Sequence, residues 1–194
     1  MLFAIRPTEL PGILEIESPV HGDSRGFFTE IYNAERWAPT GFREQFQQDN
    51  LSCSARGTMR GLHYQIEPHA QGKLVRCLRG SVFDVAVDIR RGSPAFGRWV
   101  GRTLTGANGL ALWVPAGFAH GFLALEDETL ALYKCTACYA PSAERSILWN
   151  DPAIGIAWPI PAEHFSPKDL TAPVLANADY NFVYDPKQSD PACA

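Results

Sequence analysis

The sequence predicts an all-β fold, an antiparallel sandwich or barrel, and three observations support this prediction. Apolar residues alternate with polar ones in many segments, as at 81–90, where Phe83 and Val85 would face one way and Asp84 and Asp88 the other. Turn-forming residues separate these segments at short intervals. The three-to-four-residue repeat of amphipathic helices is scarce. Regularly spaced strands with such turns are typical of antiparallel sandwiches and barrels.

Taken in chain order, the alternating segments predict strands at residues 26–32, 47–54, 58–65, 73–78, 81–90, 98–105, 109–114 and 128–139. The dipeptide Asn108-Gly109 is a strong hairpin signal, because both residues tolerate a positive φ. The tail from Asn150 onward is rich in Pro, Trp and Asp and predicts loops, with a short helix near Pro167–Leu170. No linker-like run divides the 194 residues, so we expect one domain over the whole chain, ending in a loose tail at 185–194.

The composition restricts the functions open to this chain. A net charge of −4 argues against nucleic acid as a partner, so an anionic ligand would need a local cluster of cations. The N-terminus has too short an apolar run for a signal peptide and no segment could span a membrane, which predicts a cytoplasmic protein with no membrane partner. The five cysteines are odd in number and irregularly spaced, which argues against a disulfide framework.

Two short motifs match known signatures but stand in the wrong context. The segment Gly22–Gly26 has the pattern G-x-S-x-G, yet the hydrolase elbow needs a helix after it, and strand-like alternation begins at Phe27 instead. Cys135 and Cys138 form C-x-x-C in an apparent strand, which would send the two thiols to opposite faces. Glycine-rich dinucleotide and phosphate-binding fingerprints are absent, so a nicotinamide cofactor or ATP-dependent phosphotransfer has no support.

The stretch Thr58–Gln65 concentrates groups suited to proton transfer. His63 titrates near neutrality and therefore suits a general base. Lys73, shortly downstream, could stabilise an enolate oxygen, and Tyr133 could act as an acid. Together these residues predict the removal of a proton next to a carbonyl group.

Cations near this stretch predict an anion site, with Arg60, Arg25 and Lys168 as its candidates. In an ideal strand Arg60 and His63 face opposite sides. Both therefore serve one pocket only if Gly61 marks a bulge or the end of the strand.

Two other interpretations remain open from the residues alone. His63, His69 and His120 are separated as the ligands of small β-barrel metalloenzymes often are, which allows a metal-dependent enzyme such as a dioxygenase. Such sites usually begin with two histidines one residue apart, and here the second position is Gln65, a poor ligand for a transition metal. A barrel of this kind could also bind a sugar without catalysis.

The stretch Met59–Gln65, Met-Arg-Gly-Leu-His-Tyr-Gln, resembles the signature of the dTDP-4-dehydrorhamnose 3,5-epimerase family. The similarity extends in the family's order from about Arg25 to Asp169. It includes the segments at 72–76, 83–90, 115–122, 133–134 and 149–152, and is closest in the last three.

The resemblance implies a cupin-type, jelly-roll barrel that works as a homodimer without metal or cofactor. It also implies epimerisation of a dTDP-4-keto-6-deoxyhexose, whose 4-keto group acidifies the hydrogens on C3 and C5. By the same resemblance, His63 abstracts the proton and Asp169 orients and charges it. Lys73 would stabilise the enolate, and Tyr133 would donate a proton on the other face.

The residues that hold the nucleotide and the sugar are implied in the same way: Arg25, Glu30, Gln48, Asp49, Asn50, Arg60, Lys73, His120, Glu144 and Lys168. Arg25 and Glu30 would come from the neighbouring subunit, whose N-terminal strand crosses over. Departures from the family pattern are small, at Thr58-Met59 and at Ala111. They leave open a relative that inverts only C3 or only C5.

Overall fold

The computed structural model describes residues 3–186, so most of the predicted tail, residues 187–194, lies outside the described residues. Each predicted strand is present, and so is the short helix at Pro167–Leu170. None of the helices in the described range is long and apolar enough to cross a membrane.

The elements in chain order are β1 (Ala4–Pro7), β2 (Leu14–Glu17), β3 (Val20–Asp23), β4 (Gly26–Thr29), α1 (Ala34–Trp37), the 3₁₀ turn η1 (Ala38–Thr40), β5 (Gln48–Ser54), β6 (Met59–Gln65), β7 (Lys73–Arg79), β8 (Ser81–Asp88), β9 (Trp99–Thr105), β10 (Leu110–Val114), β11 (Phe118–Ala124), β12 (Thr129–Cys135), β13 (Glu144–Ser146), α2 (Pro167–Leu170) and the 3₁₀ turn η2 (Leu175–Asn177).

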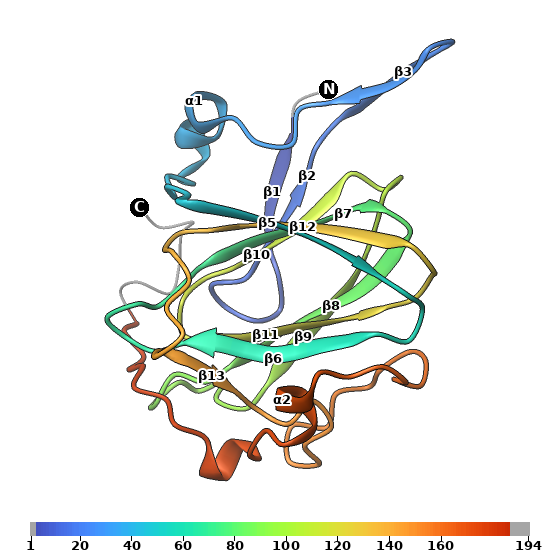
Figure 1. Cartoon of the computed structure of the whole chain (residues 1–194). Coiled ribbons are helices and arrows are strands. Elements are labelled where there is room, and N and C mark those ends of the chain that lie inside the picture. Colours follow the sequence, from blue (N-terminus) through green and yellow to red (C-terminus); the bar gives the residue numbers. More distant parts are fainter. Residues whose placement is uncertain (1–2, 187–194) are drawn as a thin grey trace.

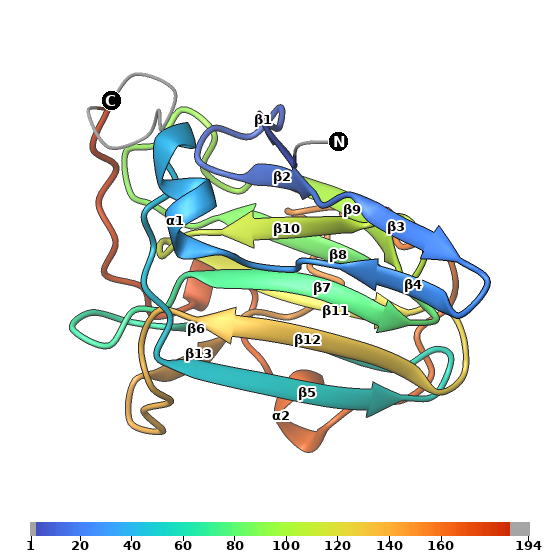
Figure 2. The same ribbon diagram turned by 90° about the horizontal axis from the view of Figure 1, so that it is seen from above.

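Two antiparallel sheets face each other, as Figures 1 and 2 show. The six-stranded sheet has the order β1-β2-β10-β7-β12-β5, and the five-stranded sheet has the order β13-β6-β11-β8-β9. Most strands pair with strands that are distant in the sequence. The antiparallel barrel predicted from the alternation is confirmed.

Strand β8 shows the predicted alternation, but both of its faces are buried. Val82 and Ala86 point into the core between the sheets. Val85 and Val87 point the other way and pack against the segment after β13, including Ile147. That segment covers the outer face of the five-stranded sheet (Figure 1) and so brings α2 close to the barrel.

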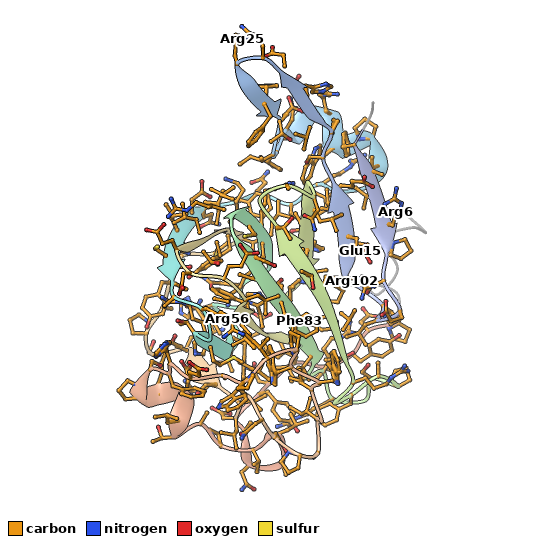
Figure 3. All side chains as sticks on the ribbon, turned by 90° about the vertical axis from the view of Figure 1, so that its right-hand side faces the viewer. Arg6, Glu15, Arg25, Arg56, Phe83 and Arg102 are labelled. Atoms are coloured by element: carbon orange, nitrogen blue, oxygen red, sulfur yellow. The ribbon has the colours of Figure 1, made fainter. Side chains whose placement is uncertain are left out.

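A hairpin of β3 and β4 projects from the barrel, and Arg25 stands at its tip (Figure 3). The G-x-S-x-G motif spans the turn between these two strands, and strand β4, not a helix, follows it directly. The structure therefore confirms that the motif is not a nucleophile elbow. The hairpin exposes two aromatic side chains to solvent, Phe27 at 66% and Phe28 at 69%.

The turn at Asn108-Gly109 is not the hairpin turn that the sequence predicts. Strand β9 before it belongs to the five-stranded sheet, and β10 after it belongs to the six-stranded sheet. The Gly109 carbonyl accepts a hydrogen bond from the Ser18 N–H at 3.0 Å, at the end of β2. Strand β10 pairs with β2, so this turn is a corner between the two sheets.

Strand β12 ends at Cys135, although the alternation predicts a strand up to residue 139. The Thr136 hydroxyl accepts a hydrogen bond from the Gly72 N–H at 2.9 Å, which draws the chain toward the loop before β7. Cys138 is therefore outside the strand and exposed, whereas Cys135 is buried. The prediction of two thiols on opposite faces of one strand was wrong.

A bulge at Gly61 changes the alternation of β6. His63 pairs with His120 and Arg60 pairs with Phe122, so three steps along β6 match two steps along β11. Because His120 and Phe122 both face inward, Arg60 and His63 can line one pocket. The bulge at Gly61, which the sequence analysis required for Arg60 and His63 to share a pocket, is present.

We expect Gly61→Ala to lower the free energy of unfolding by about 3 kcal/mol through backbone strain and overpacking. Gly61 has a φ of +141°, and an added Cβ would lie 2.5 Å from the Cα of Gly121. Gly92→Ala is the matched control, because Gly92 has a φ of +80° with nothing within 4 Å of an added Cβ. Denaturant unfolding measures both. Equal losses in the two variants would show that the contact with Gly121 contributes nothing.

Candidate active site

A cavity of about 360 Å³ lies where β5, β7 and β12 of one sheet face β6 and β11 of the other. Helix α2 and strand β13 close its rim. Its lining is mostly polar and comprises Gln48, Asn50, Arg60, His63, Tyr64, Gln65, Gln71, Lys73, His120, Phe122, Tyr133, Tyr139, Glu144, Ser166, Lys168 and Asp169.

The cavity brings together every predicted site residue except Arg25, Glu30 and Asp49. Asp49 alternates with inward-facing neighbours on β5, so its carboxylate lies on the outer face and pairs with Lys134 at 2.7 Å. Arg25 pairs with Asp23 at 2.6 Å on the projecting hairpin. Glu30, just after that hairpin, is also outside the cavity of its own chain.

His63 and Asp169 form a close pair, although they are far apart in the sequence. Asp169 Oδ1 lies 2.5 Å from His63 Nε2, and Asp169 is only 2% exposed. The other carboxylate oxygen, Oδ2, accepts a hydrogen bond from the Ser166 hydroxyl at 2.7 Å. Ser166 is the N-cap of α2 and forms a capping box with Asp169, which fixes the carboxylate at the start of the helix.

Burial sets the charge of this pair. It lowers the pKa of His63, and the opposing hydrogen bond that His63 donates to Asp169 only partly offsets this effect. His63 is therefore neutral at neutral pH, with its Nε2–H donated to Asp169. The other nitrogen, Nδ1, has no hydrogen-bond partner among residues 3–186 and is free to take a proton. Burial opposes ionisation of Asp169, but the bonds from His63 and Ser166 outweigh it and lower the pKa of this carboxyl.

Tyr133 faces His63 from the opposite sheet. Tyr133 is on β12, and its neighbours in the register are Asn50 and Val75. Burial raises the pKa of its phenol, and the nearby Cys135 acts in the same direction. The hydroxyl therefore stays protonated at neutral pH, and it can donate a proton from the wall opposite to the base.

Lys73 supplies a positive charge in the same space. Burial lowers the pKa of its ammonium group, and Cys135 followed by Asp84 and Glu144 acts against this shift. A lysine enclosed in this way is poorly hydrated, so its attraction for a developing oxyanion is strong.

Charged groups also gather at the rim. Glu144 accepts hydrogen bonds from Lys168 at 2.6 Å and from the Tyr139 hydroxyl at 2.9 Å. Burial alone would raise the pKa of Glu144, but these two bonds lower it. Arg60 is held by the Ser54 hydroxyl at 3.1 Å and leaves part of its guanidinium open to the cavity. Arg60 and Lys168 thus place positive charge at the rim, in addition to that of Lys73 deeper in the cavity.

Some residues that line the cavity are not predicted by the sequence reasoning. Ser166 was detectable, because a Ser three residues before Asp169 is the sequence pattern of a capping box. Gln65 donates to the His69 carbonyl at 2.6 Å and accepts from the Ala140 N–H at 2.8 Å. It thereby fixes the loop that carries Tyr139, a role that has no local sequence signal.

The structure gives no ligand set for the metal alternative. Within residues 3–186, no three His, Cys, Asp or Glu side chains are grouped as metal ligands. His69 does not line the cavity, and Gln65 uses its amide in the two hydrogen bonds just described.

Comparisons with known proteins agree with this geometry. Residues 7–177 match the family model described as dTDP-4-dehydrorhamnose 3,5-epimerase. An enzyme of that name from Shigella flexneri is 51% identical over 174 residues, which cover 89% of this chain and 96% of the relative.

Two solved structures share the fold. One is a dTDP-6-deoxy-D-glucose-3,5-epimerase from Legionella pneumophila, in complex with dTDP-4-keto-L-rhamnose. It has a TM-score of 0.87 and 47% identity, with coverage of 91% of this chain and 95% of that one. The other is a 3'-monoepimerase from Streptomyces bikiniensis in complex with dTDP-quinovose, with a TM-score of 0.83, 38% identity, and coverage of 88% and 87%. These matches confirm the predicted cupin-type barrel. The chain is an isomerase and belongs to the dTDP-4-dehydrorhamnose 3,5-epimerase family.

Proposed function

We propose that this protein inverts both C3 and C5 of a dTDP-4-keto-6-deoxyhexose. The observation that carries the proposal is the placement of a neutral imidazole, His63, and a protonated phenol, Tyr133, on opposite walls of one cavity. Inversion at a carbon requires a proton to leave on one face and another to arrive on the opposite face. A 4-keto group makes this possible at both adjacent carbons, because it acidifies the hydrogen on each.

In the first half of the reaction, His63 Nδ1 takes the proton from carbon. The electron pair of the C–H bond moves to the C4 oxygen and forms an enolate. Asp169 stabilises the imidazolium that results, through the bond to Nε2. The Lys73 ammonium group lies in the same cavity and stabilises the charge on the oxygen.

In the second half, the electron pair returns to carbon and takes a proton from the Tyr133 hydroxyl on the other face. One proton has then left to His63 and one has arrived from Tyr133, so the sugar is an isomer of the starting compound. The imidazolium and the phenolate return to their starting states by exchange with water. No oxidant or reductant takes part in these steps.

Polar groups at the rim are suited to the nucleotide part of the substrate. Arg60 and Lys168 carry the positive charge that a diphosphate requires, and guanidinium geometry matches phosphate oxygens. Gln48 and Asn50 line the same side of the cavity from β5 and offer amide donors and acceptors. We assign these four residues to substrate binding.

A second copy of the chain completes the site in this proposal. Arg25 and Glu30 lie outside the cavity of their own chain, and the hairpin before Glu30 projects from the barrel (Figure 3). Exposure of Phe27 and Phe28 on that hairpin favours burial against another protein surface. The protein is then a homodimer in which each hairpin reaches the partner's cavity.

We also assign the reaction to the cytoplasm. The cysteines in the described part of the chain, Cys53, Cys77, Cys135 and Cys138, are free thiols. Free thiols are typical of a reducing compartment.

The Tyr133→Phe variant should retain exchange of substrate hydrogens with deuterated water but lose most net epimerisation. The phenyl ring keeps the packing, while the donor on the second face is removed. His63→Ala should lose exchange at both carbons. NMR of a dTDP-4-keto-6-deoxyhexose in deuterated water measures both reactions and shows which carbon reacts. Exchange at C3 alone in the wild type would contradict the proposed double inversion and indicate a monoepimerase.

Tyr32→Phe is the matched control, since the Tyr32 hydroxyl donates to the Glu44 carbonyl and Tyr32 is not part of the cavity lining. It should epimerise at the wild-type rate. If Tyr133→Phe did the same, the proton donor would be another group.

The pH profile of kcat/KM should be bell-shaped. Its acid limb reports His63, whose pKa lies below the ordinary 6.5, so activity is present above that pKa and falls as pH drops through it. Its basic limb reports Lys73, whose pKa lies below the ordinary 10.5, so activity falls as pH rises through it. Lys73→Arg should move the basic limb upward, because a guanidinium stays protonated. A basic limb that did not move would belong to a different group.

Mixed dimers test the crossing of the hairpin. Arg25→Ala and His63→Ala proteins should each be nearly inactive at low substrate concentration. After mixing, unfolding and refolding together, they should regain about one quarter of wild-type activity, because half the dimers are mixed and each has one intact site. If Arg25 served its own chain, no mixed dimer would have an intact site and no activity would return.

A further inference from the structure

A second histidine–carboxylate pair lies beneath the cavity. His120 Nε2 is 2.7 Å from Asp84 Oδ1, and both side chains are buried, with Asp84 fully enclosed at 0% exposure. The two residues are on neighbouring strands, since β11 pairs with β8 and Phe122 lies opposite Asp84. His120 lines the cavity, whereas Asp84 does not.

The two nitrogens of His120 differ in their surroundings. Among residues 3–186, the buried side-chain atoms that lack a hydrogen-bond partner are Thr29 Oγ1 and Asp84 Oδ2. His120 Nδ1 also has no hydrogen bond within the described residues, yet it is not one of these two buried atoms. It must therefore be accessible to solvent. This nitrogen therefore reaches the cavity, while Nε2 is occupied by Asp84.

We propose that Asp84 is a positioning residue that holds the His120 proton on Nε2, and so makes Nδ1 a hydrogen-bond acceptor for a hydroxyl group of the sugar. A carboxylate accepts hydrogen bonds and donates none, so a neutral imidazole beside it must turn its N–H toward it. The nitrogen on the other side of the ring then presents a lone pair. Naming the ligand as a sugar rests on the proposed function.

The position of His120 indicates that it contacts the sugar of the substrate. His120 pairs directly with His63 across β11 and β6, so its Nδ1 lies beside the proposed base and faces the reacting sugar. The 4-keto oxygen and the diphosphate oxygens only accept hydrogen bonds. The groups near the reacting carbons that can donate to Nδ1 are the hydroxyls at C2 and C3.

Asp84 is enclosed and has one oxygen without a hydrogen-bond partner in the described residues, so its charge needs compensation. The Lys73 ammonium group is close enough for the two charges to interact. The carboxylate thus acts on two groups of the site, by a hydrogen bond to His120 and by charge on Lys73.

The tautomer of His120 is the direct test. In full-length protein with ¹⁵N-labelled histidine, ring-nitrogen NMR at pH 8 should show the proton of His120 on Nε2, with the signals assigned by their loss in His120→Asn. A proton on Nδ1, or on both nitrogens, would overturn the proposal. This measurement needs no substrate and no Asp84 variant.

The Asp84→Asn variant should shift the proton to Nδ1, because the amide N–H donates to Nε2 and leaves the proton to the other nitrogen. Asp88→Asn is the matched control. Asp88 lies on the same strand, is equally enclosed, and bonds Arg90 and Ser93 outside the cavity. The control should lose stability but keep the His120 proton on Nε2. An unchanged tautomer in Asp84→Asn would count against the role of Asp84.

Binding of sugars tests the acceptor role. By calorimetry, the wild type should bind dTDP-6-deoxyglucose about tenfold more tightly than one of its two analogues, the 2-deoxy or the 3-deoxy compound, because the missing hydroxyl is worth one good hydrogen bond. Asp84→Asn should lose this preference, and Asp88→Asn should keep it. A preference that survives in Asp84→Asn, or that is missing in the wild type, would overturn the proposal. Failure of all three sugars to bind, with the Nε2 tautomer present, would instead count against the proposed function.

Discussion

The site depends on the close approach of two backbones, at Gly61 on β6 and Gly121 on β11. No side chain fits between them, since an added Cβ at Gly61 would meet the Gly121 Cα at 2.5 Å. This contact sets the bulge that turns both Arg60 and His63 inward. Without it, the strand would alternate regularly, and the cation and the base would lie on opposite faces of the sheet.

Burial then prepares each group for proton transfer. The same loss of water lowers the pKa of the His63 imidazole and raises the pKa of the Tyr133 phenol. In both cases the neutral form is favoured, which leaves the imidazole without its second proton and the phenol with its own. Base and acid are therefore in the required states at the same pH. Burial is the main cause of both shifts, and for His63 the hydrogen bond to Asp169 opposes it only in part.

Much of the fold and of the site follows from local patterns in the sequence. Alternation predicts β6, β7 and β12, and these strands carry His63, Lys73 and Tyr133 into one cavity. Such local patterns do not predict which distant strands pair with each other. The corner at Asn108-Gly109 resembles a hairpin turn locally, and only the pairing of β10 with β2 shows its true role.

The same limit applies to individual site residues. Asp49 was expected at the site, but it alternates with Gln48 and Asn50 on β5 and lies on the outer face, where Lys134 is its partner. Alternation alone does not tell which face of a strand is the inner one. The pair of Asp84 and His120 depends on the register of β8 and β11, which no motif records.

The catalytic pair joins two parts of the molecule with different mechanical support. His63 is on an inner strand of a sheet, whereas Asp169 is on a one-turn helix in a covering segment that has few regular strands or helices. That segment packs on the sheet and is tied to the start of β6 by the hydrogen bond from the Met59 N–H to the His164 carbonyl. Such segments open locally at a lower free energy than the strands beneath them. Each opening would separate the carboxylate from the imidazole while the barrel stays folded. On heating, activity is then lost when the covering segment opens, at a lower temperature than the one at which the barrel unfolds.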